Sequence, residues 1–172
     1  MASPVIFQIA GFKNSGKTFL MEQLIRSGTE LGYRVGALKH HGHGGEPSHA
    51  LERTDSARHK HAGAYVSAVE GGGALLLESE SFTGTGAELP RILSSFHLDY
   101  LFIEGYKHTP FPKAVLVNSP DDFHLIPNLE NIKAVIYKSC LCIPACEAEL
   151  FTWKETDAFV SWLFEGGSLE AP

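Results

Sequence analysis

The stretch Gly11-Phe12-Lys13-Asn14-Ser15-Gly16-Lys17-Thr18 matches the pattern G-x-x-x-x-G-K-[ST] at every fixed position. In this pattern, backbone N–H groups wrap around a phosphate, and the following helix directs its positive end at the anion. We expect Lys17 to neutralise charge on the β- and γ-phosphates, and Thr18 to coordinate Mg²⁺ through its hydroxyl. The remaining loop residues expected to contact the phosphates are Gly11, Lys13, Asn14, Ser15 and Gly16.

The sequence on both sides of this loop has the context that a phosphate loop requires. Residues 4–10 form an apolar run typical of a buried parallel strand. After the loop, Leu20, Leu24 and Leu31 recur at helical spacing within residues 17–31. Further strands are predicted at residues 33–39, 98–104, 113–117 and 132–137, and helices at residues 55–62, 87–96 and 153–164. Strands that alternate with helices predict an α/β fold of three layers, the P-loop NTPase fold, with a mainly parallel sheet.

A β-hairpin is predicted within residues 64–78. The runs 64–69 and 74–77 have strand-like composition, and Glu70-Gly71-Gly72-Gly73 separates them. Such a short connection favours antiparallel pairing, which would make the sheet mixed. We interpret residues 1–172 as a single nucleotide-binding domain with the hairpin as an insertion. A free hairpin edge is also a candidate surface for pairing with a second copy.

The overall composition excludes several classes of protein. The chain has 172 residues and a formal net charge of −6, so a general nucleic-acid-coating role is not expected. No apolar run approaches the length of a membrane span, and the first residues do not resemble a secretion signal. The three cysteines (Cys140, Cys142 and Cys146) fit neither a disulfide framework nor a four-ligand zinc site. These features predict a cytoplasmic protein that does not bind nucleic acid or membranes.

An acidic group is needed, in addition to the Thr18 hydroxyl, to hold Mg²⁺ beside the phosphate loop. Glu104 ends an apolar run and precedes a glycine, which suits a carboxylate at the carboxyl end of a buried strand. Asp99 begins the same run, so it is expected at the opposite edge of the sheet. We therefore predict that Thr18 and Glu104 are the metal-binding residues.

Three further residues are candidates for the site, each with a simpler alternative. Lys39 ends the second predicted strand and could meet phosphate charge, or be a solvated lysine. Asp55 could contact Mg²⁺ or position the attacking water, or only cap a short helix. Arg58 could clamp a phosphate, because its planar guanidinium suits bidentate binding. We count Asp55 with Lys17, Thr18 and Glu104 as the candidate catalytic residues.

Several motifs occur together in a specific order, and the combination resembles a known family. They are Gly11–Thr18, then Gly36-Ala37-Leu38-Lys39-His40, then Asp55-Ser56-Ala57-Arg58 leading to Ala62-Gly63-Ala64, then Phe102-Ile103-Glu104-Gly105-Tyr106-Lys107. This pattern is similar to that of the molybdopterin-guanine dinucleotide biosynthesis adapter family, MobB. The resemblance covers most of residues 4–137.

The resemblance implies a P-loop protein that binds GTP with Mg²⁺, hydrolyses it weakly and forms a homodimer. It also implies a partner, the molybdenum cofactor guanylyltransferase, which joins GMP to molybdopterin. In this interpretation the adapter supplies GTP or aids cofactor delivery, and does not perform the main transfer.

Guanine preference cannot be identified from the residues themselves. Many GTP-binding proteins recognise the base with Asn-Lys-x-Asp, whereas the nearest match here is Asn118-Ser119-Pro120-Asp121, without the lysine. Lys138-Ser139 after a later strand is an equally loose candidate. A small-molecule kinase that uses ATP therefore remains an alternative function.

A histidine cluster offers another alternative, a nucleotide-driven nickel or zinc metallochaperone. Six of the nine histidines lie between His40 and His61. Imidazole is a common ligand for both metals. Against a metal site, His41 and His43 lie in a glycine-rich loop without a companion cysteine, and His59 and His61 would face different directions on a helix.

Overall fold

The computed structural model describes residues 3–40, 58–59, 61–79 and 88–167. The chain divides into two compact units, one made of residues 1–43 and 86–172 and the other of residues 44–85. The larger unit contains the phosphate loop and the principal sheet, and the smaller unit contains the hairpin.

The larger unit is built on a six-stranded sheet in the order β2-β5-β1-β6-β7-β8, in which every pair of neighbours is parallel. Its strands are β1 Val5–Ala10, β2 Val35–Lys39, β5 Tyr100–Glu104, β6 Lys113–Val117, β7 Ile132–Tyr137 and β8 Glu149–Thr152. Because all six run in one direction, their carboxyl ends meet at one edge of the sheet. The segments that follow β1, β2 and β5 are therefore neighbours.

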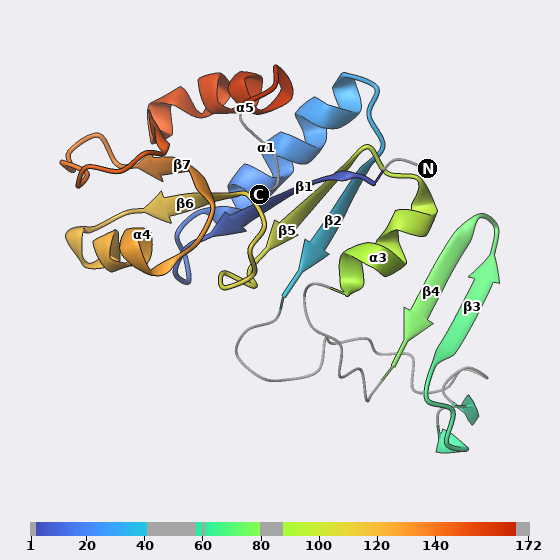
Figure 1. Ribbon diagram of the computed structural model, residues 1–172. Helices are drawn as coiled ribbons and strands as arrows, with labels where there is room; N and C mark the ends of the chain where they lie inside the picture. The colour runs from blue at the N-terminus through green and yellow to red at the C-terminus, as the bar shows by residue number, and fades with distance from the viewer. Residues whose placement is uncertain (1–2, 41–57, 60, 80–87, 168–172) are drawn as a thin grey trace. The chain divides into compact units, whose positions relative to one another are not determined.

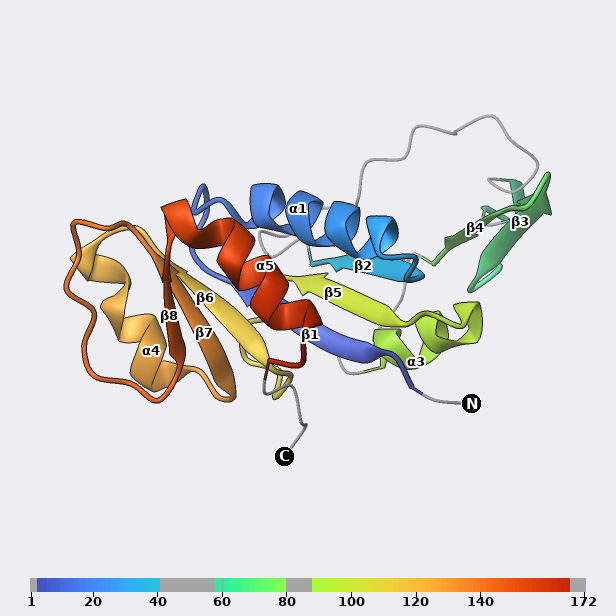
Figure 2. The same ribbon diagram turned by 90° about the horizontal axis from the view of Figure 1, so that it is seen from above.

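Helices cover both faces of this sheet, as predicted for a three-layer α/β fold (Figure 1). Helices α1 (Lys17–Glu30) and α5 (Thr156–Phe164) lie on one face, where Figure 2 shows them side by side over the strands. Helices α3 (Leu89–Leu93) and α4 (Leu125–Asn128) lie on the other face. Three short 3₁₀ helices complete the unit: η1 Ser94–Phe96, η2 Pro120–His124 and η3 Trp153–Glu155. None of the described helices has the length and apolar character that a membrane span requires.

Each face of the sheet has its own hydrophobic core. On the α1/α5 face, Phe7 and Ile9 of β1 pack with Leu24 and Phe159 of the two helices. On the α4 face the buried residues are Ala10, Val115, Val117, Leu125, Leu129 and Val135. All five residues of β6 are buried, which explains why the four residues after Lys113 are apolar with no alternation.

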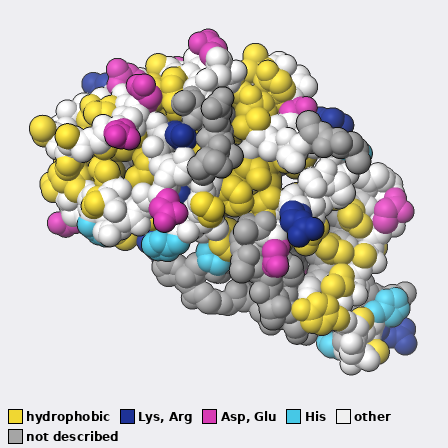
Figure 3. Space-filling view, in the orientation of Figure 1, with side chains coloured by type: hydrophobic (Ala, Val, Ile, Leu, Met, Phe, Trp, Pro, Cys, Tyr) yellow, Lys and Arg dark blue, Asp and Glu magenta, His cyan; other side chains and the backbone are white. Residues whose placement is uncertain are grey.

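The smaller unit contains the predicted hairpin, with β3 Ser67–Gly71 antiparallel to β4 Ala74–Glu78. Gly72 and Gly73 make the turn with φ of 58° and 81°, values that favour glycine and suit a tight hairpin. The hairpin forms a two-stranded sheet of its own, so the expectation that it would make the principal sheet mixed is wrong. Leu75 and Leu77 are exposed, so the hairpin lacks the buried face that a strand of the principal sheet presents. Figure 3 shows hydrophobic side chains at many places on the visible face of the molecule.

Candidate functional site

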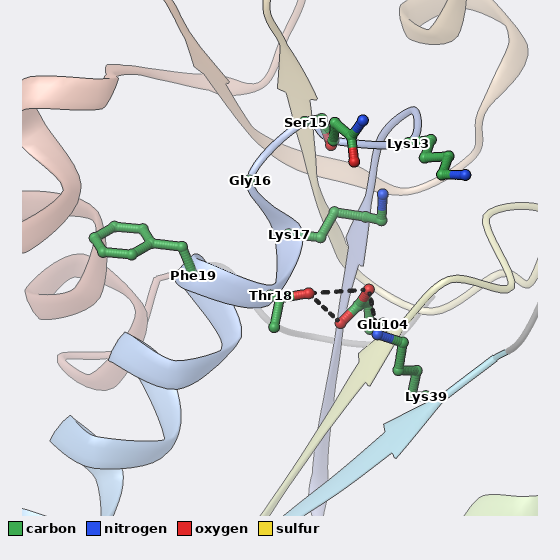
Figure 4. Close-up of a pocket in the computed structure, with 9 residues that line it drawn as sticks. Lys13, Ser15, Gly16, Lys17, Thr18, Phe19, Lys39 and Glu104 are labelled. Carbon is green, nitrogen blue, oxygen red and sulfur yellow. Dashed lines mark hydrogen bonds and ion pairs between the residues drawn. The ribbon is translucent and has the colours of Figure 1, made fainter. Parts of the chain in front are cut away.

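The phosphate loop connects the buried strand β1 to helix α1 and borders a cavity of about 420 Å³ (Figure 4). The cavity is lined by Lys13, Asn14, Ser15, Gly16, Lys17, Thr18, Phe19, Lys39 and Glu104. Seven of these residues come from the loop and the first turns of α1, and the other two end the neighbouring strands β2 and β5. The predicted strand-loop-helix context of the motif is therefore present.

The backbone of the loop takes a conformation that its sequence accommodates. Asn14 and Gly16 have φ of 60° and 96°, in the left-handed region that asparagine and glycine tolerate best. A Cβ atom on Gly16 would lie 2.6 Å from Cη2 of Trp153. Glycine is required at this position both for the turn and for the close approach of the indole ring.

Two polar groups of the loop are candidates for contact with a ligand. The Ser15 hydroxyl is buried, and no hydrogen-bond partner for it lies in the described part of the chain. The Lys17 ammonium donates to the carbonyl oxygen of Phe12 at 2.6 Å, within the loop itself. Buried polar atoms normally have partners, so an unpaired hydroxyl beside this cavity fits a site for a polar ligand.

Thr18, Glu104 and Lys39 converge below the loop (Figure 4). The Thr18 hydroxyl donates to the Glu104 carboxylate, with oxygen–oxygen distances of 3.2 and 3.5 Å. The Lys39 ammonium lies 3.5 Å from Glu104 Oε1, because Lys39 and Glu104 are paired in register on β2 and β5. A hydroxyl and a carboxylate so close together supply the oxygen ligands that Mg²⁺ prefers.

The charge of Lys17 is costly to maintain without an anion. Burial lowers the pKa of the Lys17 ammonium below its ordinary value. The Glu104 carboxylate opposes this shift, while the positive charges of Lys39 and Lys107 lower the Lys17 pKa further. An anionic ligand in the cavity would relieve the repulsion among these lysines.

Asn118 and Trp153 support the loop from outside the motif. The Asn118 side chain, after β6, donates to the carbonyl oxygen of Ser15 at 3.1 Å and accepts from the Trp153 indole N–H at 3.0 Å. We call this pair the Asn118–Trp153 bracket. The sequence marked Asn118 only through a loose base-recognition motif and Trp153 only as the start of a helix, so neither indicated contact with the loop.

The Asn118-Ser119-Pro120-Asp121 segment has a clear local structure. The carboxylate of the next residue, Asp122, accepts from the backbone N–H groups of Asn118 and Ser119 at 2.7 and 3.1 Å. This carboxylate caps the 3₁₀ helix η2. The segment thus fixes the end of β6, where the Asn118 side chain reaches the phosphate loop.

Two of the other predicted residues are not placed relative to this group. Asp55 lies outside the described residues, and Arg58 belongs to the smaller unit. Asp99 precedes β5 at the opposite edge, where it accepts from the backbone N–H of Arg34 at 2.7 Å. Of the clustered histidines, only His40, His59 and His61 are described. Within the described residues, no group of three or more His, Cys, Asp or Glu side chains is placed to hold a metal ion.

Comparison with known proteins gives a consistent result. Residues 6–138 match the family model described as molybdopterin guanine dinucleotide synthesis protein B, MobB. A protein of Bacillus subtilis (strain 168), described as "Probable molybdopterin-guanine dinucleotide biosynthesis adapter protein", is 42% identical over 133 residues, which are 77% of this chain and 76% of the relative.

Solved structures agree with the sequence matches. The crystal structure of Bacillus subtilis MobB has a TM-score of 0.77 and 32% identity, and that of a MobB homologue from Bacillus stearothermophilus has a TM-score of 0.74 and 30% identity. Each comparison covers 96% of this chain and 99% of the other. With a family match over most of its length and relatives of this similarity, the chain belongs to the MobB family.

Proposed function

We propose that this chain is a GTP-binding adapter with weak GTPase activity that serves the synthesis of molybdopterin guanine dinucleotide. One observation carries the nucleotide-binding part of the proposal. The phosphate loop, the Thr18 hydroxyl and the Glu104 carboxylate surround one cavity, with Lys17 and Lys39 beside them. This is the set of groups that a Mg²⁺-bound polyphosphate requires.

Thr18 and Glu104 are the residues that would hold Mg²⁺. Their oxygen atoms lie 3.2 Å apart, and the carboxylate is buried against the Thr18 hydroxyl and Lys39. Bound Mg²⁺ would neutralise charge on the phosphate oxygens. In this arrangement Glu104 provides the anionic ligand, and Lys39 balances the charge of the carboxylate.

We propose that hydrolysis at this site is slow. The chain contributes backbone N–H groups of the loop and the Lys17 ammonium, which would stabilise negative charge on the phosphates during in-line attack by water. Among the described residues that line the cavity, Glu104 is the only carboxylate, and it is already engaged by Thr18 and Lys39. Efficient turnover would then depend on groups supplied by a partner.

The adapter part of the proposal rests on family membership. A curated relative, 42% identical, is described as a probable biosynthesis adapter for molybdopterin-guanine dinucleotide. We propose that the partner of this chain is the molybdenum cofactor guanylyltransferase, with molybdopterin as the molecule that it modifies. We also propose that the chain acts in the cytoplasm as a homodimer.

The test of nucleotide binding is a calorimetric titration of the chain with GTP, GDP and ATP, with Mg²⁺ and with a chelator in its place. We expect GTP to bind more tightly with Mg²⁺ than without it. The variant Glu104→Gln should lose this Mg²⁺ dependence, because it removes the anionic ligand. Glu22→Gln, which neutralises an exposed carboxylate on α1, is the matched control and should retain the dependence.

The outcome separates the proposed function from its alternatives. Tighter binding of ATP than GTP would favour the kinase interpretation. Failure to bind any of the three nucleotides would exclude the proposal. The adapter role is tested separately by co-purification of the chain with the guanylyltransferase in the presence and absence of GTP.

A further inference from the structure

A short loop at residues 105–109 begins directly after Glu104, and buried polar side chains hold it in place. The Gln8 amide donates to the carbonyl oxygen of Gly105 and accepts from the Thr109 hydroxyl at 3.2 Å. The Lys113 ammonium donates to the carbonyl oxygens of Thr109 at 2.7 Å and Glu130 at 2.6 Å. Both Gln8 and Lys113 are completely buried.

The burial of Gln8 and Lys113 costs free energy, because the buried part of the sheet is largely apolar. Burying an amide or an ammonium loses its hydration, and hydrogen bonds must replace it. Here most of the replacement bonds go to the backbone and the Thr109 hydroxyl of one loop. The loop also holds Tyr106 at φ 47°, an unfavourable conformation for a large side chain. Such strain persists where the surroundings fix the backbone, and it is common at ligand sites.

The fixed loop presents Lys107 beside the phosphate loop. The Lys107 ammonium lies 5.0 Å from the centre of the Phe12 ring, and the carbonyl oxygen of Phe12 accepts from Lys17. The charge of Lys107 is close enough to act on Lys17. Lys107 is half-buried, and within the described residues no carboxylate forms an ion pair with it. Lys39, by contrast, is paired with Glu104.

We propose that Lys107 contacts the terminal phosphate of the bound nucleotide and makes the site prefer triphosphates to diphosphates. This inference rests on the proposed function. The physical basis of the proposed preference is charge, because with Mg²⁺ bound a triphosphate carries one more negative charge than a diphosphate. Lys17 serves either ligand, and Lys39 already balances Glu104. Lys13 also lines the cavity, within the phosphate loop itself. Lys107 is a further cation, outside that loop, which the 105–109 loop holds in place to meet the added charge.

The test measures the ratio of the affinities for GTP and GDP, each with Mg²⁺. Lys107→Ala should lower the affinity for GTP by about tenfold, the effect of one charge-assisted contact, and leave the affinity for GDP nearly unchanged. Lys107→Arg should restore most of the preference, because it keeps the charge. Lys133→Ala is the matched control: Lys133 is also half-buried, but lies near the start of β7, at the opposite edge of the sheet.

Each outcome has a distinct meaning. If the wild-type chain binds GTP and Lys107→Ala retains its preference for GTP over GDP, the inference is overturned and the proposed function stands. An equal loss of affinity for both nucleotides would also overturn it, since Lys107 would then not distinguish the terminal phosphate. If the wild-type chain binds no nucleotide, the proposed function and this inference both fail.

Discussion

In the proposed function, Lys17 is the residue on which phosphate binding depends most directly. Its ammonium is bonded to a loop carbonyl at 2.6 Å and lies close to the charges of Lys39 and Lys107. Lys17→Ala should weaken GTP binding by about 100-fold, because we expect the lysine to make charge-assisted bonds to two phosphates. Titration calorimetry measures this loss. Lys133→Ala again serves as the charge control, and GTP affinity that is equal in the two variants would contradict the assignment of the loop.

Lys113 makes the stability of the fold depend on pH. Burial lowers its pKa from 10.5 to about 8 in the folded chain. Between these two values the unfolded chain binds more protons than the folded chain, so the free energy of unfolding rises with pH. Below about pH 8 both states carry the proton, and the full cost of burying the charge is present.

The variant Lys113→Met isolates this contribution, because it keeps an unbranched side chain only one atom shorter and removes the titrating group. From about pH 7 to about pH 10, the wild type should gain about 1–2 kcal/mol of stability relative to the variant. Urea denaturation at the two pH values measures the difference. Titration of other groups affects both proteins equally, so a constant difference would show that the Lys113 pKa is not lowered.

At the scale of elements, the Asn118–Trp153 bracket links the ends of three strands. The phosphate loop follows β1, Asn118 follows β6, and Trp153 follows β8. Trp153→Phe should retain an aromatic ring against Gly16 but remove the donor to Asn118. We expect it to lower the free energy of unfolding by about 1 kcal/mol and GTP affinity several-fold, because the Ser15 backbone loses support.

Trp162→Phe is the matched control for this prediction. Trp162 lies on α5, where its ring packs on Phe159 and Phe151. Both variants are measured by urea denaturation and GTP titration. If Trp162→Phe lowers GTP affinity as much as Trp153→Phe does, the bracket has no specific role in holding the loop.

Burial explains which elements could be predicted from the sequence. Strands β1, β5, β6 and β7 are predominantly apolar, because both faces of the sheet are covered. The edge strand β8 was missed: it has four residues, and Glu149 and Leu150 in it are exposed. Helix α4 was missed as well, since it is four residues long and contains Pro127.

The site was predictable where it depends on local pattern. The motif identified the loop, and strand ends identified Lys39 and Glu104 as neighbours of the cavity. The 3.5 Å pairing of these two side chains depends on the register of β2 with β5, which no local pattern specifies. The Asn118–Trp153 contact and the anchoring of the 105–109 loop by Gln8 likewise arise only from the tertiary fold.

At the scale of the whole molecule, the hairpin bears on the predicted homodimer. Leu75 and Leu77 are 52% and 53% exposed and lie on the same face of β4, because their positions differ by two. Within the described residues neither outer edge of the hairpin pairs with another strand. Exposed apolar residues and open strand edges both favour association with another chain.

Sedimentation equilibrium should therefore detect a dimer of the wild-type chain, and the double variant Leu75→Lys/Leu77→Lys should sediment as a monomer. Lysine on an edge hairpin opposes pairing through charge repulsion and through the cost of burying the ammonium. The control variant Leu150→Lys makes the same change on β8, at a residue that is 45% exposed. The chain with this substitution should remain a dimer. A wild-type chain that is monomeric at every concentration would remove the hairpin as an assembly surface, whereas a dimer that survives the double variant would place the interface elsewhere.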